Sequence, residues 1–155
     1  MNYNLETLSE RYSIEKVKVS KKAEYAIRAV ITIARYTNNK PLQISEISEK
    51  ESIPIKFLEQ ILLNLKNSGI LKSKRGAKGG YLLAQPTDCI SIGMILEIID
   101  GSFDPVGLNT NNHLGAGLEK CFGDLVSMVN THLNKFTIQD ILEIEEPKDL
   151  IAFEI

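Results

Sequence analysis

Residues 70–83 read ILKSKRGAKGGYLL, a basic and glycine-rich turn between two apolar segments. Four cations and three glycines occur between Lys72 and Gly80. Glycine adopts positive φ without strain, so such a turn can reverse the chain sharply. The pattern predicts a short β-hairpin in which ILKSK pairs with YLLAQ and the turn RGAKGG carries the positive charge.

Two predicted helices open the chain upstream of this hairpin. The first follows Ser20, a good N-cap, and repeats apolar residues at helical spacing within SKKAEYAIRAVITIARY. The second is the short segment SEISEKE, with Ser45 as its expected N-cap and with Ile44 and Ile47 turned inward.

A third predicted helix runs directly into the hairpin. It starts at Pro54, which suits a first helical turn, and Gly69 is expected to cap its end in the left-handed conformation. Its expected buried residues are Ile55, Leu58, Ile61, Leu62 and Leu65. Helix, short helix, turn, helix and basic hairpin is the order of elements in a winged helix-turn-helix.

The chain changes character after Pro86. Ser91 is the expected cap of a helix over SIGMILEIID, and GSFDPVGLNTNNHLGAG reads as a long polar loop. LEKCFGDLVSMVNTHLNKF repeats apolar residues near helical spacing, which suits a dimerisation helix. Thr137 and Asp140 then resemble the capping box of a last helix.

These patterns predict a mainly α fold with one small β-hairpin. The expected organisation is an N-terminal extension over residues 1–17, a winged helix-turn-helix domain over 18–87, and a dimerisation region over 88–155 that could also sense a signal. Residues 1–16 have two open readings: a small amphipathic helix that docks across a dimer or onto DNA, or residues upstream of a start at Val17.

Charge divides the 155-residue chain in the same way as the elements do. Residues 20–86 carry twelve Lys and Arg against five Glu, and the remainder carries six cations against fifteen acids. A basic module inside a chain of net charge −2 indicates a polyanionic partner such as DNA. No apolar run is long enough for a membrane span, and MNYNLETLSERYSIEK lacks the apolar core of a signal peptide, so we expect a cytoplasmic protein.

Three segments resemble the Rrf2 family of bacterial transcriptional regulators. They are VSKKAEYAIRAV, ISEISEKESIPIKFLEQILLNLKNSGILKSKRGAKGGYLLAQP and ISIGMILEIIDG, which together span about residues 18–101. The resemblance implies a homodimeric winged-helix protein that binds double-stranded DNA through its recognition helix and wing. Many family members sense iron–sulfur clusters, nitric oxide, redox state or cysteine metabolism.

The expected DNA contacts fall into three groups. In the third helix, Gln60 can pair with adenine and Glu59 can accept a hydrogen bond from cytosine, and the resemblance places this pair on the DNA side. Cations of the hairpin neutralise phosphates, and Arg75 could instead enter a narrow minor groove. The full set of candidates is Lys21, Lys22, Tyr25, Arg28, Ser45, Lys56, Phe57, Glu59, Gln60, Lys74, Arg75, Gly76 and Lys78.

Two of these candidates have a second, equally weighted reading. Tyr25 and Arg28 of the first helix could anchor phosphates, or they could only pack and bridge within the domain.

We expect no cofactor and no metal. Cluster-binding relatives carry three closely spaced cysteines in the long loop between the helix that follows the wing and the dimerisation helix, and this chain has only Cys89 and Cys121. A dimer could still assemble an unusual site from Asp104, His113, Glu119 and Cys121. The family also contains cysteine-poor members, and the resemblance to these implies a signal that arrives as a metabolite or through a partner enzyme.

The sequence speaks against an enzyme. Neither His113 nor His132 stands in a metal-ligand or catalytic-triad spacing, and GAKGG lacks the ending of a phosphate-binding loop. The expected function is a sequence-specific regulator that represses transcription as a homodimer on a pseudo-palindromic operator. The alternatives are a winged-helix adaptor that binds proteins instead of DNA, or a regulator with an unusual cluster site.

Overall fold

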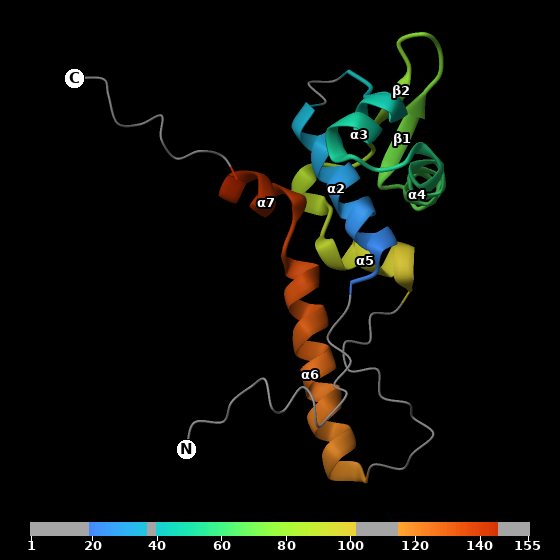
Figure 1. The fold of residues 1–155 in the computed structure, drawn as a ribbon. Helices are drawn as coiled ribbons and strands as arrows, with labels where there is room; N and C mark the ends of the chain where they lie inside the picture. The colour runs from blue at the N-terminus through green and yellow to red at the C-terminus, as the bar shows by residue number, and fades with distance from the viewer. Residues whose placement is uncertain (1–18, 37–39, 102–114, 146–155) are drawn as a thin grey trace, which may run out of the picture.

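The computed structural model describes residues 19–36, 40–101 and 115–145 (Figure 1). In chain order the elements are α2 Lys21–Tyr36, α3 Ile44–Glu51, α4 Ile55–Asn67, β1 Leu71–Lys74, β2 Gly80–Leu83, the short 3-10 helix η1 Thr87–Cys89, α5 Ile92–Asp100, α6 Ala116–Lys135 and α7 Ile138–Glu145. The protein is therefore mainly α with one two-stranded hairpin, as the sequence predicts.

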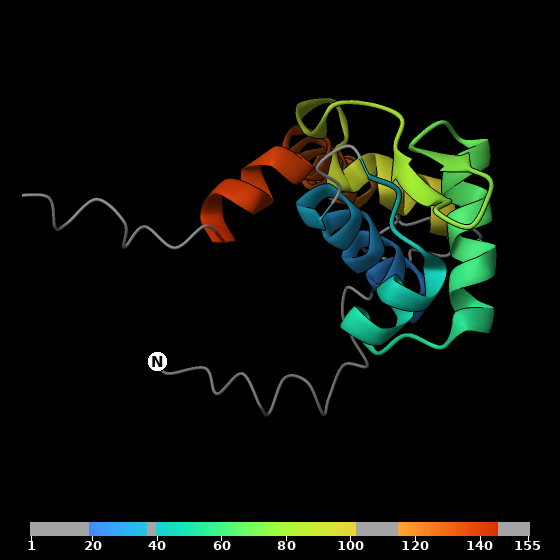
Figure 2. The ribbon, with the colours of Figure 1, turned by 90° about the horizontal axis from the view of Figure 1, so that it is seen from above.

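Helix α2 lies at the centre of the molecule. It packs against α3, α4, α5, α7 and β2, and α4 and α7 lie on opposite sides of it in the view of Figure 2. Its buried face consists of Ala23, Ala26, Ala29, Val30, Thr32 and Ile33. Alanines on this face let neighbouring helices approach closely, so one helix can serve as the core of the whole domain.

The α3–α4 pair forms the helix-turn-helix, and two details differ from expectation. Ser45 is not the N-cap of α3, because the cap is Gln43, whose backbone is extended and which forms a capping box with Glu46. Ile55 is 43% exposed rather than buried, although Leu58, Ile61, Leu62 and Leu65 of the same stripe are buried. Ile55 is the first residue of α4, and the described residues cover its side chain only in part.

The predicted end of α4 is confirmed. Gly69 has a φ of 77°, its N–H donates to the carbonyl of Lys66, and the N–H of Ile70 donates to the carbonyl of Leu65. These two bonds form a Schellman motif, and the buried Ile70 and Leu65 supply its usual apolar contact. Because the motif reverses the chain, β1 starts immediately after the helix.

The predicted hairpin is present, and the structure gives its register. Leu71 pairs with Leu83 and Lys74 with Gly80, while the turn closes with a 2.9 Å bond from the N–H of Gly79 to the carbonyl of Gly76. The outer side of β2 is joined to the chain before α3 through a bridge between Leu42 and Tyr81. The wing is therefore attached to the helix-turn-helix by main-chain hydrogen bonds.

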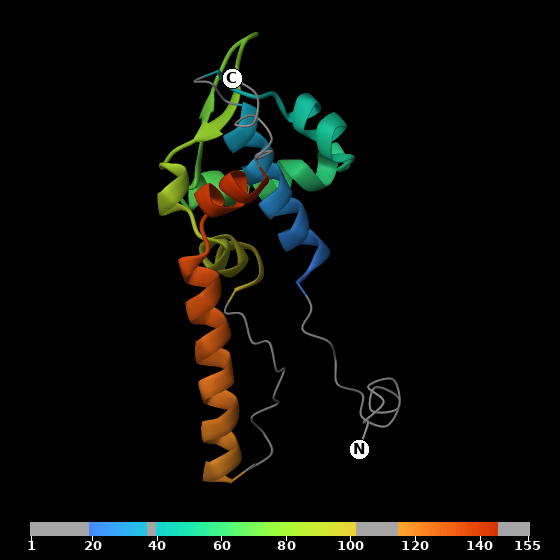
Figure 3. The ribbon, with the colours of Figure 1, turned by 90° about the vertical axis from the view of Figure 1, so that its left-hand side faces the viewer.

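Helix α6 projects away from the rest of the molecule, at the end opposite to the hairpin (Figures 1 and 3). It is 20 residues long and has no fully buried residue. It crosses α5 where Gly93 meets Asn134, and a Cβ at Gly93 would lie 2.2 Å from the Asn134 side-chain oxygen. Within the described residues, several apolar side chains of this helix therefore remain exposed.

The expected caps of α2, α5 and α7 are present. The N–H of Ala23 donates to Ser20 Oγ at 3.0 Å, and that of Met94 donates to Ser91 Oγ at 3.1 Å. Thr137 and Asp140 form the predicted capping box, with reciprocal bonds of 2.7 and 3.2 Å. The Asp140 carboxylate accepts the Thr137 N–H and hydroxyl bonds, and this lowers the pKa of Asp140.

Some expectations lie outside the described residues. These are the extension over residues 1–17 and most of the loop with Asp104 and His113. Among the helices that the structure describes, none has the length and apolarity to cross a lipid bilayer.

Candidate nucleic-acid interface

The exposed side of α4 carries all four candidates that the sequence places on the recognition helix. Lys56, Phe57, Glu59 and Gln60 are exposed, whereas Leu58, Ile61 and the other residues of the buried stripe face the core. Phe57 is 57% exposed, which is unusual for a large apolar side chain. The helical period of 3.6 residues separates these two faces of α4. The spacing of apolar residues in the sequence is therefore enough to identify the face that is exposed.

An aromatic pair links α4 to α2 beside this face. The rings of Tyr25 and Phe57 lie edge to face, with centroids 6.5 Å apart. Lys21 Nζ lies 5.2 Å from the centre of the Tyr25 ring, and Arg28 Cζ lies 5.9 Å from it. The start of the recognition helix is thus held against the first helix by a contact that also gathers two cations.

Arg28 makes ion pairs within the domain. Its Nε donates to Glu51 at 3.0 Å, a second nitrogen donates to the Glu51 carbonyl, and Nη1 lies 3.3 Å from Glu24. Thr32 donates to the same Glu51 carboxylate. The hydrogen bond with Glu51 raises the pKa of Arg28. The sequence left two roles open for Arg28, a phosphate contact or a bridge within the domain. The structure shows ion pairs within the domain.

Lys21 and Lys22 are placed differently. Lys21 is exposed and pairs with Glu24 at 2.8 Å, a contact that lowers the pKa of Glu24. Lys22 is half-buried. An exposed pair of this kind is weak, so Lys21 can exchange Glu24 for a phosphate at little cost.

The hairpin carries the free positive charge. Lys72, Lys74, Arg75 and Lys78 are exposed, and none of them pairs with an acidic side chain among the described residues. Gly76 at the tip has a φ of 111°. A turn of this shape leaves the cations on a narrow projecting edge, where they can approach a phosphate backbone closely.

The N-terminus of α3 faces the same hairpin. Ser45 is exposed in the first turn of α3 without capping it. Gln43, which the sequence reading missed, caps the helix and also donates from Nε2 to the carbonyl of Ala77 in the wing turn, at 3.2 Å. Glu46, three residues after Gln43, was the available signal, since this spacing is that of a capping box.

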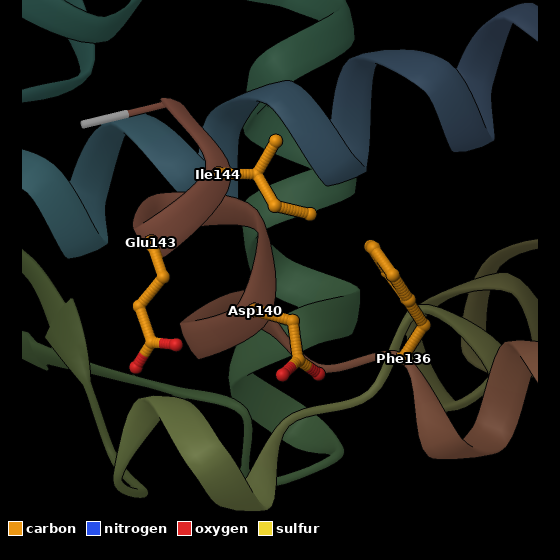
Figure 4. Close-up of a pocket in the computed structure, with 4 residues that line it drawn as sticks. All are labelled: Phe136, Asp140, Glu143 and Ile144. Carbon is orange, nitrogen blue, oxygen red and sulfur yellow. The ribbon is translucent and has the colours of Figure 1, made fainter. Parts of the chain in front are cut away.

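A cavity of about 540 Å³ lies against α7, lined by Phe136, Asp140, Glu143 and Ile144 (Figure 4). Its two acids are already bonded: Asp140 accepts from Thr137, and Glu143 accepts from Gln139 at 2.8 Å. None of the four described residues that line it is a cation that could bind a phosphate. It therefore adds nothing to a nucleic-acid interface.

The cysteines do not fit an iron–sulfur cluster. Cys89 lies at the end of η1, which contacts α7. Cys121 lies in the second turn of α6, and about 21 Å of helix separates it from Lys135, the residue at which α6 ends before α7. Both are exposed, and no group of three His, Cys, Asp or Glu side chains gathers within the described ranges. Clusters are bound mainly by thiolates, so one chain with two separated cysteines cannot complete an ordinary site.

Comparison with known proteins agrees with this geometry. The Rrf2 family model, described as an iron-dependent transcriptional regulator, matches residues 19–144. The HTH-type transcriptional regulator IscR of Erwinia tasmaniensis is 28% identical over 135 residues, which cover 84% of this chain and 81% of that protein.

Two solved structures share the fold. CymR, the global cysteine regulator of B. subtilis, superposes with a TM-score of 0.74 at 26% identity and covers 83% of this chain and 98% of its own. IscR of T. potens superposes with a TM-score of 0.70 at 25% identity, covering 88% and 93%.

Proposed function

The chain belongs to the Rrf2 family of transcriptional regulators, and from this premise we propose that it is a homodimeric repressor that binds a pseudo-palindromic operator. The observation that carries the proposal is the juxtaposition of an exposed polar face on α4 with an unpaired cationic hairpin packed beside it. Together they match the groove-reading helix and the phosphate-binding wing of a winged helix-turn-helix.

Helix α4 and the hairpin would contact different parts of the DNA because their side chains differ in chemistry. Gln60 and Glu59 offer the amide and carboxylate groups that pair with adenine and cytosine edges in the major groove. Arg75, Lys74 and Lys78 offer positive charge and hydrogen-bond donors, which suit phosphates or, for Arg75, a narrow minor groove. Lys56 and Phe57 flank the reading residues, and Lys21, Lys22, Tyr25, Arg28 and Ser45 complete the proposed contact surface.

The homodimer is proposed from α6. Leu118, Leu125 and Met128 are 51%, 44% and 68% exposed on it, at spacings that put them on one side of the helix. A second copy packed on this row would bury apolar area that water otherwise contacts. The two recognition helices would then lie about one DNA turn apart, near 34 Å.

We further propose that the signal reaches this regulator without an iron–sulfur cluster. A small metabolite or a partner enzyme is the proposed source, and the protein acts in the cytoplasm. The family description is iron-dependent, so a cluster assembled across a dimer from Asp104, His113, Glu119 and Cys121 is the alternative. Anaerobic purification with iron and sulfide analysis tests this, because a colourless, iron-free protein that binds DNA removes the cluster.

A salt titration tests the DNA proposal. A duplex selected from a random library against the full chain serves as the probe. Wild-type affinity should fall steeply with salt, with a slope near −0.9 per phosphate contact in a log–log plot. Arg75→Ala should weaken all sequences and reduce the slope, whereas Gln60→Ala should cost about 1–3 kcal/mol and relax preference at one base pair.

Lys120→Ala is the matched control for these variants. It removes an exposed cation from α6, at the other end of the molecule, and should leave affinity and slope unchanged. A protein that selects no duplex, or whose binding ignores salt, would instead be the protein-binding adaptor.

A further inference from the structure

The wing is attached to the helix-turn-helix at two points. Close to the turn, in β2, the N–H of Leu42 donates to the carbonyl of Tyr81 at 3.0 Å, and the N–H of Tyr81 donates back at 2.8 Å. Near its tip, the side chain of Gln43 donates to the carbonyl of Ala77 at 3.2 Å. The residues that bind the wing are thus consecutive and lie immediately before α3.

Gln43 uses both ends of its amide. The side-chain oxygen accepts the N–H of Glu46 as part of the capping box, and the Glu46 carboxylate accepts the N–H of Gln43 at 2.7 Å. The side-chain nitrogen remains for Ala77. The capping bond therefore fixes the amide so that its donor points at the wing.

We infer that Gln43 is a positioning residue for DNA binding, which holds the tip of the wing against α3 so that Arg75 and Lys78 meet the DNA from a fixed backbone. This inference rests on the proposed DNA-binding function. Ala77 lies between Arg75 and Lys78 in the turn. One hydrogen bond to its carbonyl therefore restrains the backbone of both cations. A wing ordered before binding loses less conformational entropy when the complex forms.

Among the described residues, the Gln43 bond is the one hydrogen bond that joins residues 75–79 to the rest of the domain. Within the turn, the bond from the Gly79 N–H to the carbonyl of Gly76 closes the loop on itself but does not attach it to the domain. Gly76 and Gly79 give the turn wide conformational freedom without such an attachment.

Gln43→Ser separates the two roles of the side chain. Serine is a strong N-cap and keeps the capping box with Glu46, but it is too short to reach Ala77. Gln85→Ser is the matched control, because Gln85 also donates from Nε2 to a main-chain carbonyl, that of Gly69, at 2.9 Å, away from the wing tip. Both proteins should unfold at temperatures close to that of the wild type.

The first readout uses the free protein. In Gln43→Ser, amide relaxation should report increased ps–ns motion at residues 76–79, while the amides of α3 keep their order. Gln85→Ser should leave the wing amides unchanged. Wing amides that are equally ordered in Gln43→Ser and in the wild type would overturn the inference.

The second readout is a double-mutant cycle on the selected duplex. Gln43→Ser should weaken binding about two- to tenfold in the wild type and hardly at all in an Arg75→Ala/Lys78→Ala background, since the Gln43 bond acts through these two cations. Full additivity with Arg75→Ala/Lys78→Ala would overturn the inference, because Gln43 would then act elsewhere. If the wild type binds no duplex while Gln43→Ser still loosens the wing, the proposed function fails and the attachment of the wing stands.

Discussion

Arg28 and Arg75 show at the residue scale how neighbours decide what a charge can do. Arg28 lies between Glu24 and Glu51 and has ion-pair partners in both. Arg75 sits on a projecting turn and is exposed, without an acidic partner in the described part of the chain. The first guanidinium joins α2 to α3, whereas the second is available to a polyanion.

Neighbouring residues also determine the reactivity of the Cys89 thiol. Cys89 is exposed, yet its thiol donates a hydrogen bond to Asp88 and also feels the charge of that carboxylate, and both effects raise the pKa of Cys89. The reactive thiolate is thereby scarce near neutral pH.

We predict that alkylation of Cys89 by iodoacetamide becomes half-maximal at a higher pH than alkylation of a cysteine in an unstructured peptide. Asp88→Asn should shift this profile to lower pH and speed the reaction several-fold at neutral pH, because the negative charge is gone. Site-resolved mass spectrometry measures the rate, with Cys121 in the same sample as the internal reference. Identical profiles for Asp88→Asn and the wild type would contradict the assignment.

At the scale of elements, the hairpin depends on glycine for two different reasons. Gly76 is in open space and needs only its positive φ. Gly80 has a φ of 148°, and a Cβ there would lie 2.4 Å from the carbonyl oxygen of Leu42. The second glycine is therefore required by the tight packing of β2 against the segment before α3, in addition to its backbone conformation.

Gly80→Ala should lower the free energy of unfolding by about 1–3 kcal/mol, because either Leu42 or the strand must move to admit the methyl group. Gly123→Ala is the control, and its effect should have the opposite sign. Gly123 lies in α6 with nothing within 4 Å of its Cβ position, so alanine there should raise the free energy of unfolding by about 0.5–1 kcal/mol. Urea unfolding measures both. A Gly80→Ala protein as stable as the parent would show that the Leu42 contact is not close.

At the scale of the whole molecule, α6 is the element that a single chain leaves incomplete. Ten residues of the core of α2, α3 and α4 are entirely buried in the chain itself: Ala23, Ala26, Ala29, Val30, Ile33, Ile47, Leu58, Ile61, Leu62 and Leu65. Helix α6 instead keeps Leu118, Leu125 and Met128 exposed. Within the described residues, the winged domain thus has a core of its own while α6 exposes an apolar row, and this contrast supports the proposed dimer.

Leu125→Glu should convert the proposed dimer to a monomer and reduce operator affinity at least about tenfold, because the two half-sites would bind independently. Ser127→Glu introduces the same charge about 200° away around the helix and should preserve both properties. Analytical ultracentrifugation and a binding titration measure the two effects. Dimeric Leu125→Glu protein with full affinity would assign the interface to another surface.

Much of the fold and of the candidate interface could be predicted because it depends on local periodicity. The buried stripe of α4, its end at Gly69, the presence of the hairpin and the caps at Ser20, Ser91 and Thr137 all follow from the chemistry of neighbouring residues. The exposed set at Lys56, Phe57, Glu59 and Gln60 follows from the same period, since a helix with one buried stripe must present the other side.

What the sequence determined by itself was the winged helix-turn-helix, its basic hairpin and the absence of a cysteine set for an ordinary cluster. Only the tertiary structure decided that Arg28 pairs with Glu51, that Ile55 is left uncovered, and that Gln43 rather than Ser45 caps α3 and binds the wing. Periodicity shows which side of an element is apolar. A contact between residues far apart in the chain depends on how the elements pack, and a local sequence pattern carries no information about that packing.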